Sequence, residues 1–312
     1  MLPVTTACVL CGSGDFSVEF QLATSDIAKL YRHCTAIDIT SEFSGISRVD
    51  FCRCRNCDLG FFWPPVTGSS DFYAKLQRKD PQYYQGTKPE YDMGKRFIRP
   101  EDKVLEVGSG VGNFSLAIQC ESYTGLEFNE QAIDDAQRRG INVIRQSVES
   151  HAVEHVDEYD VVCSFQVLEH VSNVREFLSA QSVAVRPGGL LIACVPSEDS
   201  YMTTCWNSYY NMPPHHVTRW SDKALANICR VLPLDSVVIE HEQVADGHKL
   251  SYLTSLVLRS FGPRFRQRSG IDISFSFRLA NKVARALAGR LLLGLDDRML
   301  PHGHSVLAVF RK

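Results

Sequence analysis

The chain has 312 residues, 44% of them hydrophobic and 22% charged, which is enough to bury a core without disulfide staples. Its formal net charge of −3 gives no general reason to expect nucleic-acid binding, and no nucleic-acid partner is predicted. No run of about 18 apolar residues predicts a membrane-spanning helix, and the first residues lack the basic and apolar regions of a signal peptide, so a cytoplasmic protein is expected.

Residues 1–65 are rich in cysteine and lack long helical periodicity. Two CxxC pairs, CVLC (8–11) and CRNC (54–57), supply four soft thiolate ligands, and in a reducing compartment clustered cysteines favour metal over disulfides. The ligands predicted for zinc are Cys8, Cys11, Cys54 and Cys57. With no open ligand position the site is predicted to be structural. The alternative is that the four thiols are unrelated and simply buried. Cys34 and Cys52 are not assigned to the metal site.

The stretch WPPVTGSS (63–70) is predicted to be a linker, because Pro-Pro and Gly-Ser-Ser interrupt regular structure. Residues 66–98 as a whole are interpreted as a linker and helical lid with one or two helices. The main domain is expected to span 99–312.

From 102 onward, short apolar runs alternate with helical patterns, as βαβ units do. Strands are predicted at 103–107, 123–127, 142–146, 159–165, 190–196, 235–244 and 304–312. Helices are predicted at 113–120, 130–140, 173–185 and 221–232, with a turn at RPGG (186–189). The pattern predicts an α/β fold with seven strands.

The segment of about 248–300, which precedes the last strand, is longer than a hairpin needs and is predicted to be a helical insertion. Its basic residues lie among apolar ones; they are Arg259, Arg264, Arg266, Arg268, Arg278, Lys282, Arg285 and Arg290. One interpretation is a solvated helical face. The other is a basic amphipathic surface, over about 259–290, that contacts a membrane or an anionic substrate.

A glycine-rich turn follows the first predicted strand of the main domain. In VLEVGSGVGNF the glycines are Gly108, Gly110 and Gly112, and Glu106 precedes them. Glycines after a strand let the backbone turn sharply and approach a ligand closely. The GxGxG spacing differs from the GxGxxG of dinucleotide-binding folds. Glu127 ends the second strand, and a carboxylate there suits the two hydroxyls of a ribose.

These residues resemble motif I of class I S-adenosylmethionine-dependent methyltransferases, and SFQVLEHV (164–171) and RPGGLLIACVP (186–196) resemble later segments of the same family. The resemblance implies a Rossmann-like seven-stranded sheet. It implies that Glu106 and the glycine loop hold the methionine part of the cofactor and that Glu127 binds the ribose. It further places Ser147 and Val148 near the adenine and Phe165 and Gln166 near the methyl group.

A zinc segment ahead of such a domain resembles bacterial methyltransferases that act on nucleotide-linked sugars. That resemblance implies a general base at His216 in PPHHVTRW, and gives His215 and His170 as further catalytic candidates. Because the prolines favour an extended backbone, whose adjacent side chains point to opposite sides, His215 and His216 are not expected to face the substrate together. Tyr83 and Tyr84 resemble tyrosines that cap the pocket.

The function predicted is methyl transfer to a small hydroxylated acceptor, a sugar or sugar nucleotide first. One alternative is a non-catalytic zinc-containing scaffold with a degenerate domain, and another is an enzyme for a lipid-linked acceptor. A protein or RNA methyltransferase is disfavoured, because no Asn/Asp-Pro-Pro-Tyr/Phe motif follows the fourth strand.

Overall fold

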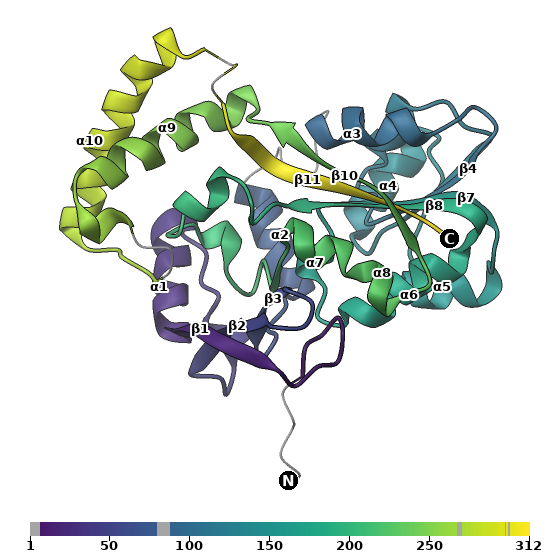
Figure 1. The fold of residues 1–312 in the computed structure, drawn as a ribbon, viewed down its shortest axis with the longest axis horizontal. Coiled ribbons are helices and arrows are strands. Elements are labelled where there is room, and N and C mark those ends of the chain that lie inside the picture. The colour runs from purple at the N-terminus through teal and green to yellow at the C-terminus, as the bar shows by residue number, and fades with distance from the viewer. Residues whose placement is uncertain (1–6, 80–87, 267–269, 297, 299) are drawn as a thin grey trace.

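The larger of two sheets has seven strands in the order β10-β11-β8-β7-β4-β5-β6 (Figure 1). The structure is a computed structural model and describes residues 7–79, 88–266, 270–296, 298 and 300–312. The strands are β4 (Lys103–Val107), β5 (Ser122–Leu126), β6 (Val143–Ile144), β7 (Tyr159–Phe165), β8 (Val185–Pro196), β10 (Asp235–Gln243) and β11 (His302–Arg311). The predicted seven-stranded α/β fold is confirmed.

The connections place the ends of the central strands together. Strand β4 pairs in parallel with β5 and β7, β5 pairs in parallel with β6, and β7 pairs in parallel with β8. Only β11 runs the other way, between β8 and β10. In an open parallel sheet, ligands bind at the carboxyl ends of the strands, so the edge beyond β4, β5 and β7 is the expected site.

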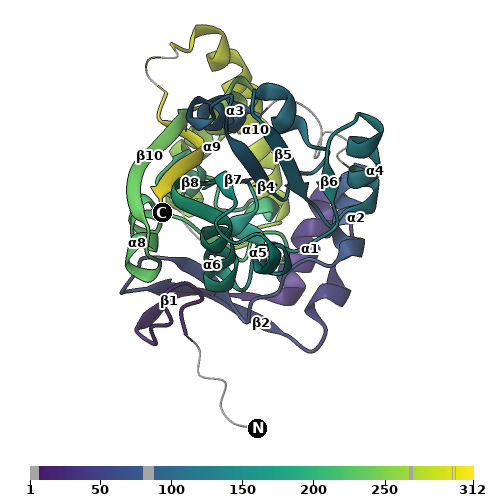
Figure 2. The same ribbon diagram turned by 90° about the vertical axis from the view of Figure 1, so that its right-hand side faces the viewer.

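Both faces of the sheet are covered, as the period of two along each strand requires. Leu105 and Val107 belong to a core cluster with the helices α5 (Val148–Glu154), α6 (Val174–Ala184), α7 (Asp222–Ala226) and α8 (Ile228–Val231). Val104 belongs to a second cluster with α3 (Pro89–Gly94) on the other face (Figure 2). Helix α4 (Glu130–Arg138) packs against β6 at the sheet edge.

A second, four-stranded antiparallel sheet lies in the N-terminal part of the molecule. Its order is β1-β2-β3-β9, with β1 (Phe16–Ala23), β2 (Arg48–Cys54), β3 (Gly60–Trp63) and β9 (Thr218–Arg219). Strand β9 comes from the main domain, so the chain far downstream completes the N-terminal sheet. The helix α1 (Thr24–Thr35) was not predicted. Its buried Leu30 and Tyr31 lie three and four residues after the buried Ile27, so all three face the aromatic core of this module.

Two local predictions are wrong. Residues 113–120 form only the 3₁₀ turn Asn113–Ala117, because Phe114 is held in the core between Tyr91 and Phe165 and the chain is already extended at Ile118 on its way to β5. The predicted turn at 186–189 lies inside β8, where Gly188 has a φ of 79° and the pairing with β7 is irregular.

The predicted helical insertion is present. Helices α9 (Asp246–Ser260) and α10 (Phe275–Leu291) pack against each other and project from the sheet at the upper left of Figure 1. No helix among the described residues is both long and apolar enough to cross a bilayer. In the predicted lid, α2 (Ser70–Lys79) and α3 are helical. Arg268, Tyr83 and Tyr84 lie outside the described residues.

Candidate functional site

A cavity of about 2060 Å³ lies beyond the carboxyl ends of β4, β5 and β7. Its wall includes residues 107–111 after β4, 126–131 after β5, 145–149 after β6 and 165–167 at the end of β7. Pockets for a single small ligand usually measure about 300–1000 Å³. This cavity therefore has room for two small molecules side by side.

The glycine loop forms a close-fitting part of this wall. Gly108 has a φ of 71°, and a Cβ added there would lie 2.5 Å from Cγ2 of Val167. Gly110, with a φ of 54°, also lines the cavity. Gly112 does not; a Cβ there would meet Ile141, so this glycine allows packing against the neighbouring strand. Among the described residues, no group hydrogen-bonds to the buried Ser109 hydroxyl, which also lines the cavity.

Glu127 is held rigidly by backbone N–H groups. Its Oε1 accepts hydrogen bonds from the N–H groups of Phe128 (2.7 Å) and Asn129 (2.9 Å), and its Oε2 accepts one from Gly110 (2.9 Å). The residue lines the cavity. A carboxylate oriented in this way presents its remaining lone pairs to a ligand that carries two neighbouring hydroxyls.

Glu106 is placed differently from the expectation. Its carboxyl group is buried, accepts a short hydrogen bond from the hydroxyl of Tyr123 and is absent from the cavity wall. Burial raises its pKa to about 8. The carboxyl group of Glu106 therefore lies away from a ligand in the cavity. Its hydrogen bond to Tyr123 instead links β4 to β5 next to the glycine loop.

The remaining predicted cofactor residues all line the cavity. Ser147 caps the N-terminus of α5, where its hydroxyl accepts from the N–H of Ser150, and Val148 follows it. Phe165 ends β7 and packs against Tyr91. Gln166 adopts a φ of 58° and donates from Nε2 to the hydroxyl of Ser305.

His170, His215 and His216, here called the histidine cluster, line the same cavity. The rings of His215 and His216 are stacked, with centroids 4.5 Å apart, and the ring of His170 lies 4.6 and 4.9 Å from them. The expectation that His215 and His216 face apart is wrong. Their N–H groups both donate to the carbonyl of Met212, so residues 213–216 form a turn rather than an extended run.

Nδ1 of each histidine in the cluster lies within hydrogen-bonding distance of an oxygen. Nδ1 of His170 lies 2.6 Å from the carbonyl of His215, and Nδ1 of His215 lies 3.1 Å from the carbonyl of Tyr210. Nδ1 of His216 lies 3.1 Å from Oδ1 of Asn211. These oxygens accept, which favours the tautomer with the hydrogen on Nδ1 and the lone pair on Nε2.

The cluster is neutral at physiological pH. Burial lowers the pKa of His170 to about 4. Burial, reinforced by the neighbouring imidazoles, holds the pKa values of His215 and His216 well below the ordinary range. All three rings therefore offer nitrogen lone pairs rather than positive charge.

Sequence reasoning missed three buried carboxyl groups in the cavity wall, those of Glu90, Glu169 and Glu242. Burial raises the pKa of Glu169 to about 8 and that of Glu242 to about 7. Glu169 lies next to His170 in LEH, so its neighbour could have drawn attention to it. Glu90 and Glu242 reach the cavity through α3 and β10, and no local motif marks them.

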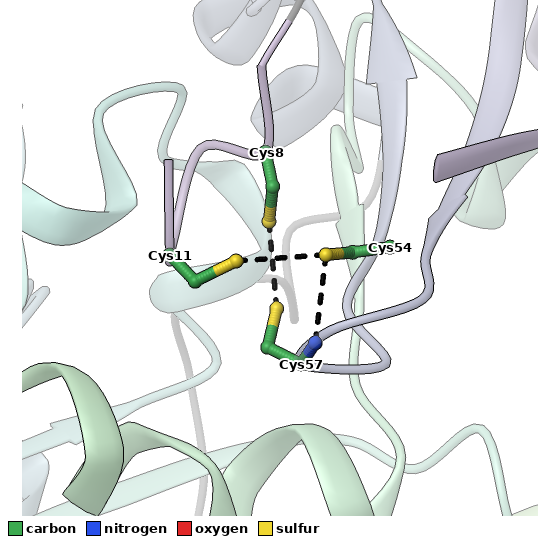
Figure 3. Close-up of side chains that lie close together, drawn as sticks. All are labelled: Cys8, Cys11, Cys54 and Cys57. Carbon is green, nitrogen blue, oxygen red and sulfur yellow. Dashed lines mark hydrogen bonds between the residues drawn. The ribbon is translucent and has the colours of Figure 1, made fainter. Parts of the chain in front are cut away.

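The four predicted cysteines, here called the cysteine cluster, come together beneath the N-terminal sheet (Figure 3). Their Sγ atoms all lie within 4.8 Å of one another; Cys8 is 3.4 Å from Cys57, and Cys11 is 3.5 Å from Cys54. Hydrogen bonding from Cys57 lowers the pKa of Cys8 to about 5. Four sulfur ligands at this spacing can hold a tetrahedral metal ion. Cys52 lies outside the cluster.

Comparison with known families identifies the main domain. Residues 71–232, just over half of the chain, match the model of a methyltransferase domain family. The chain belongs to this methyltransferase family. The match covers the glycine loop, Glu127 and the histidine cluster, and it supports an S-adenosylmethionine-dependent methyltransferase.

Curated relatives cover only part of the methyltransferase. A ubiquinone biosynthesis O-methyltransferase from Cronobacter sakazakii is 36% identical over 95 residues, which are 28% of this chain and 39% of that protein. The corresponding enzyme from Shewanella pealeana is also 36% identical over 95 residues, 28% of this chain and 40% of the relative. The matched part thus spans about two fifths of these relatives.

Solved methyltransferase structures are more distantly similar. A methyltransferase from Archaeoglobus fulgidus is 18% identical, with a TM-score of 0.49, over 78% of this chain and 100% of that chain. A putative methyltransferase from Bacillus halodurans is 13% identical, with a TM-score of 0.47, over 72% of this chain and 97% of that chain.

The residues of the methyltransferase fit the family's cofactor. Gly108 leaves space that a Cβ would fill, the Ser109 hydroxyl is buried without a described partner, and the carboxylate of Glu127 suits a ribose. A ribose that bears a 2′-phosphate would place negative charge beside Glu127. The donor set therefore favours S-adenosylmethionine over a phosphorylated dinucleotide.

Proposed function

We propose that this methyltransferase transfers a methyl group to a hydroxyl oxygen of a small polyhydroxylated acceptor, with a sugar as the first candidate. The observation that carries the proposal is that Glu127 and the histidine cluster line one cavity. A cofactor held at Glu127 and an acceptor held at the histidines would share one cavity of sufficient size. Alignment of two reactants in this way is the main requirement of methyl transfer.

The cofactor would be held by the glycine loop at Gly108 and Gly110, by Glu127 and by Ser147 and Val148. Phe165 and Gln166 would stand next to its reactive end, as the sequence predicted. When bound, S-adenosylmethionine supplies an electrophilic methyl group on a sulfonium that leaves as a neutral thioether. The chain itself therefore has to position the acceptor and handle its proton.

The histidine cluster is the part of the wall suited to the acceptor's hydroxyl. Sequence analysis assigned the base to His216 alone. In the structure, His216 shares one wall with His170 and His215, so we extend the role to the cluster. Its nitrogen lone pairs accept a hydrogen bond from the hydroxyl and orient its oxygen toward the methyl group.

Polar groups around the cluster support a hydroxylated acceptor. Glu169, Glu242, Tyr210 and Ser305 line the same cavity and supply several hydrogen-bonding groups. The name of the curated relatives, ubiquinone biosynthesis O-methyltransferase, supports oxygen rather than carbon as the methylated atom. That name also makes a phenolic acceptor the natural competitor to a sugar.

The test is turnover with a panel of sugars, sugar nucleotides and phenols, monitored as S-adenosylhomocysteine released. His216→Gln is expected to reduce turnover more than about 100-fold while calorimetry shows unchanged cofactor affinity. His155→Gln, a histidine outside the cavity wall, is the control. Turnover of the His216 variant at the level of the control would remove the cluster from the reaction.

We further propose that the cysteine cluster binds a structural zinc ion. Four thiolates leave no position for substrate, and the cluster is part of the core that joins the N-terminal sheet to the main domain. Elemental analysis of protein purified under reducing conditions tests this. Protein that retains its fold without any bound zinc would refute it.

A second candidate is an acceptor presented at a lipid surface. Helix α10 exposes an apolar stripe with a spacing of four residues, composed of Phe275, Leu279, Val283, Leu287 and Leu291. The same helix carries Arg278, Lys282, Arg285 and Arg290 and no acidic residue. An apolar stripe flanked by positive charge alone favours an anionic bilayer over a protein partner.

Co-sedimentation with vesicles tests this surface. The chain is expected to bind phosphatidylglycerol vesicles and to be released by high salt, whereas phosphatidylcholine vesicles bind it weakly. Leu279→Asp with Leu287→Asp should abolish binding. Val153→Asp, an exposed valine on α5, is the matched control. Equal binding of both variants would exclude α10 as the contact.

A further inference from the structure

We propose that His170, His215 and His216 form a second metal centre, a three-nitrogen site for a divalent transition-metal ion such as zinc that is open to the cavity. Metal binding at this site does not depend on the proposed function. Only the catalytic role of the bound ion rests on that function. With a metal bound, His216 is a ligand and no longer the base predicted from the sequence.

The ligand atoms are already close together. Each histidine offers one ring nitrogen, and these three nitrogens lie within 4.8 Å of one another. Zinc–nitrogen bonds of about 2.0–2.1 Å in a tetrahedron place ligand nitrogens roughly 3.4 Å apart. A small rotation of the rings closes that difference. The ligands come from two short segments, the 3₁₀ turn Leu168–His170 and the turn at 213–216.

The partners of Nδ1 are those of metal-binding histidines. A ligating histidine commonly donates its other ring N–H to a backbone carbonyl or a side-chain oxygen, which fixes the ring and its tautomer. Here His170 and His215 donate to carbonyls and His216 donates to Asn211. Three such bonds restrain the rings and leave the second nitrogen of each ring as the candidate ligand atom.

Glu169 provides an independent reason for a cation. Its carboxyl group is buried, and among the described residues no other residue donates a hydrogen bond to either oxygen. Oε1 lies 3.8 Å from Nε2 of His170. A buried carboxylate without a partner is destabilising. A dication held by the histidine cluster would favour the ionised form of this carboxyl group across a short distance of low dielectric.

The site would be open rather than closed. Three nitrogen ligands leave at least one position of a tetrahedral ion unfilled, which is typical of catalytic zinc, whereas the cysteine cluster already supplies four ligands. All three histidines line the cavity, so the open position faces the acceptor. There the ion would lower the pKa of the acceptor's hydroxyl, a function that weakly basic, buried imidazoles perform poorly alone.

Metal stoichiometry of the full chain tests the proposal. Chelator-stripped, reduced protein titrated with zinc is expected to bind about two ions per chain. The double variant His170→Gln with His216→Gln should bind about one. His155→Gln with His302→Gln, two histidines outside the cavity wall, is the matched control and should still bind about two. Cobalt in place of zinc distinguishes the sites without any variant, because only thiolates give intense near-ultraviolet charge-transfer bands.

The outcomes separate the two proposals. A wild-type chain that binds a single cobalt ion, with thiolate bands only, overturns the histidine metal centre, and it does so even where the double variant fails to fold. If that chain still binds S-adenosylmethionine and methylates an acceptor, the proposed function stands. A second cobalt ion with weak visible bands and no thiolate character supports the site, whether or not an acceptor has been found.

Discussion

Replacement of Glu127 by Gln changes only one atom of the carboxylate that is expected to bind the ribose. Three backbone N–H groups converge on this carboxylate, at 2.7 and 2.9 Å on one oxygen and 2.9 Å on the other. An amide retains one oxygen. In the orientation that keeps the bonds to Phe128 and Asn129, its NH₂ group faces the N–H of Gly110, and a donor replaces the acceptor offered to one ribose hydroxyl.

The expected loss follows from these contacts. Hydrogen bonds to a charged group are each worth about 1.5–3 kcal/mol, so removal of one toward the ligand weakens cofactor binding by roughly 10- to 100-fold. Isothermal titration with S-adenosylmethionine measures this directly. Glu176→Gln, an exposed residue of α6 outside the cavity wall, should bind as wild type. Affinity of the Glu127 variant within threefold of wild type, with an intact thermal transition, would refute the assignment of Glu127 to the ribose.

Three further predictions concern the loop, a buried acid and the cysteine cluster. Gly108→Ala should weaken cofactor binding at least about tenfold, because the added Cβ would lie 2.5 Å from a side-chain atom of Val167. Gly140→Ala is the control, because Gly140 has a similar φ but lies in open space, and this variant should change only stability. Equal cofactor affinities of the two variants, measured by titration, would contradict the prediction. Burial raises the pKa of Glu106 to about 8 in the folded state, so its contribution to stability is present below the unfolded pKa near 4.5 and is lost as the pH rises toward 8. Glu106→Gln should therefore reduce the fall in melting temperature between about pH 5 and 9, although Glu169, whose pKa is also raised to about 8, still contributes to that fall. An unchanged pH profile would show that Glu106 is charged in the folded protein. Chelation of metal under reducing conditions should lower the melting temperature by at least about 5 °C, and a transition that zinc readdition does not restore would argue against a structural metal.

Much of the sheet could be predicted because its signals are local. The apolar runs at 103–107 and 159–165, each bounded by turn residues, form β4 and β7 with the predicted limits. The CxxC pairs also carry their own signal, and the structure brings the four cysteines together as expected. Such features depend on residues that are close in the chain or fixed by the chemistry of one residue type.

The failures depend on tertiary context. The segment 113–120 has a helical pattern, but burial of Phe114 between two aromatic rings limits it to one 3₁₀ turn. Glu106 has the expected motif position, yet the hydroxyl of Tyr123 on the neighbouring strand draws its carboxyl group away from the cavity. Proline next to two histidines favours an extended backbone locally, but the carbonyl of Met212 accepts from both following N–H groups and closes a turn.

The N-terminal module contacts the turn that carries His215 and His216. The hydroxyl of Tyr31 in α1 donates to the carbonyl of Met212, 3.2 Å away. The guanidinium of Arg219 lies over the ring of Phe51, 4.6 Å from its centroid, and donates to the carbonyl of Asn211 at 2.8 Å.

Asn211 in turn receives the Nδ1 hydrogen of His216, so the histidine cluster is oriented through contacts that begin in the N-terminal sheet. Strand β9 pairs with β3 of the N-terminal sheet, and β3 pairs with β2. Strand β2 ends at Cys54, which belongs to the cysteine cluster. Loss of the proposed metal from the cysteines is therefore expected to affect the histidine cluster through the aromatic core and Arg219.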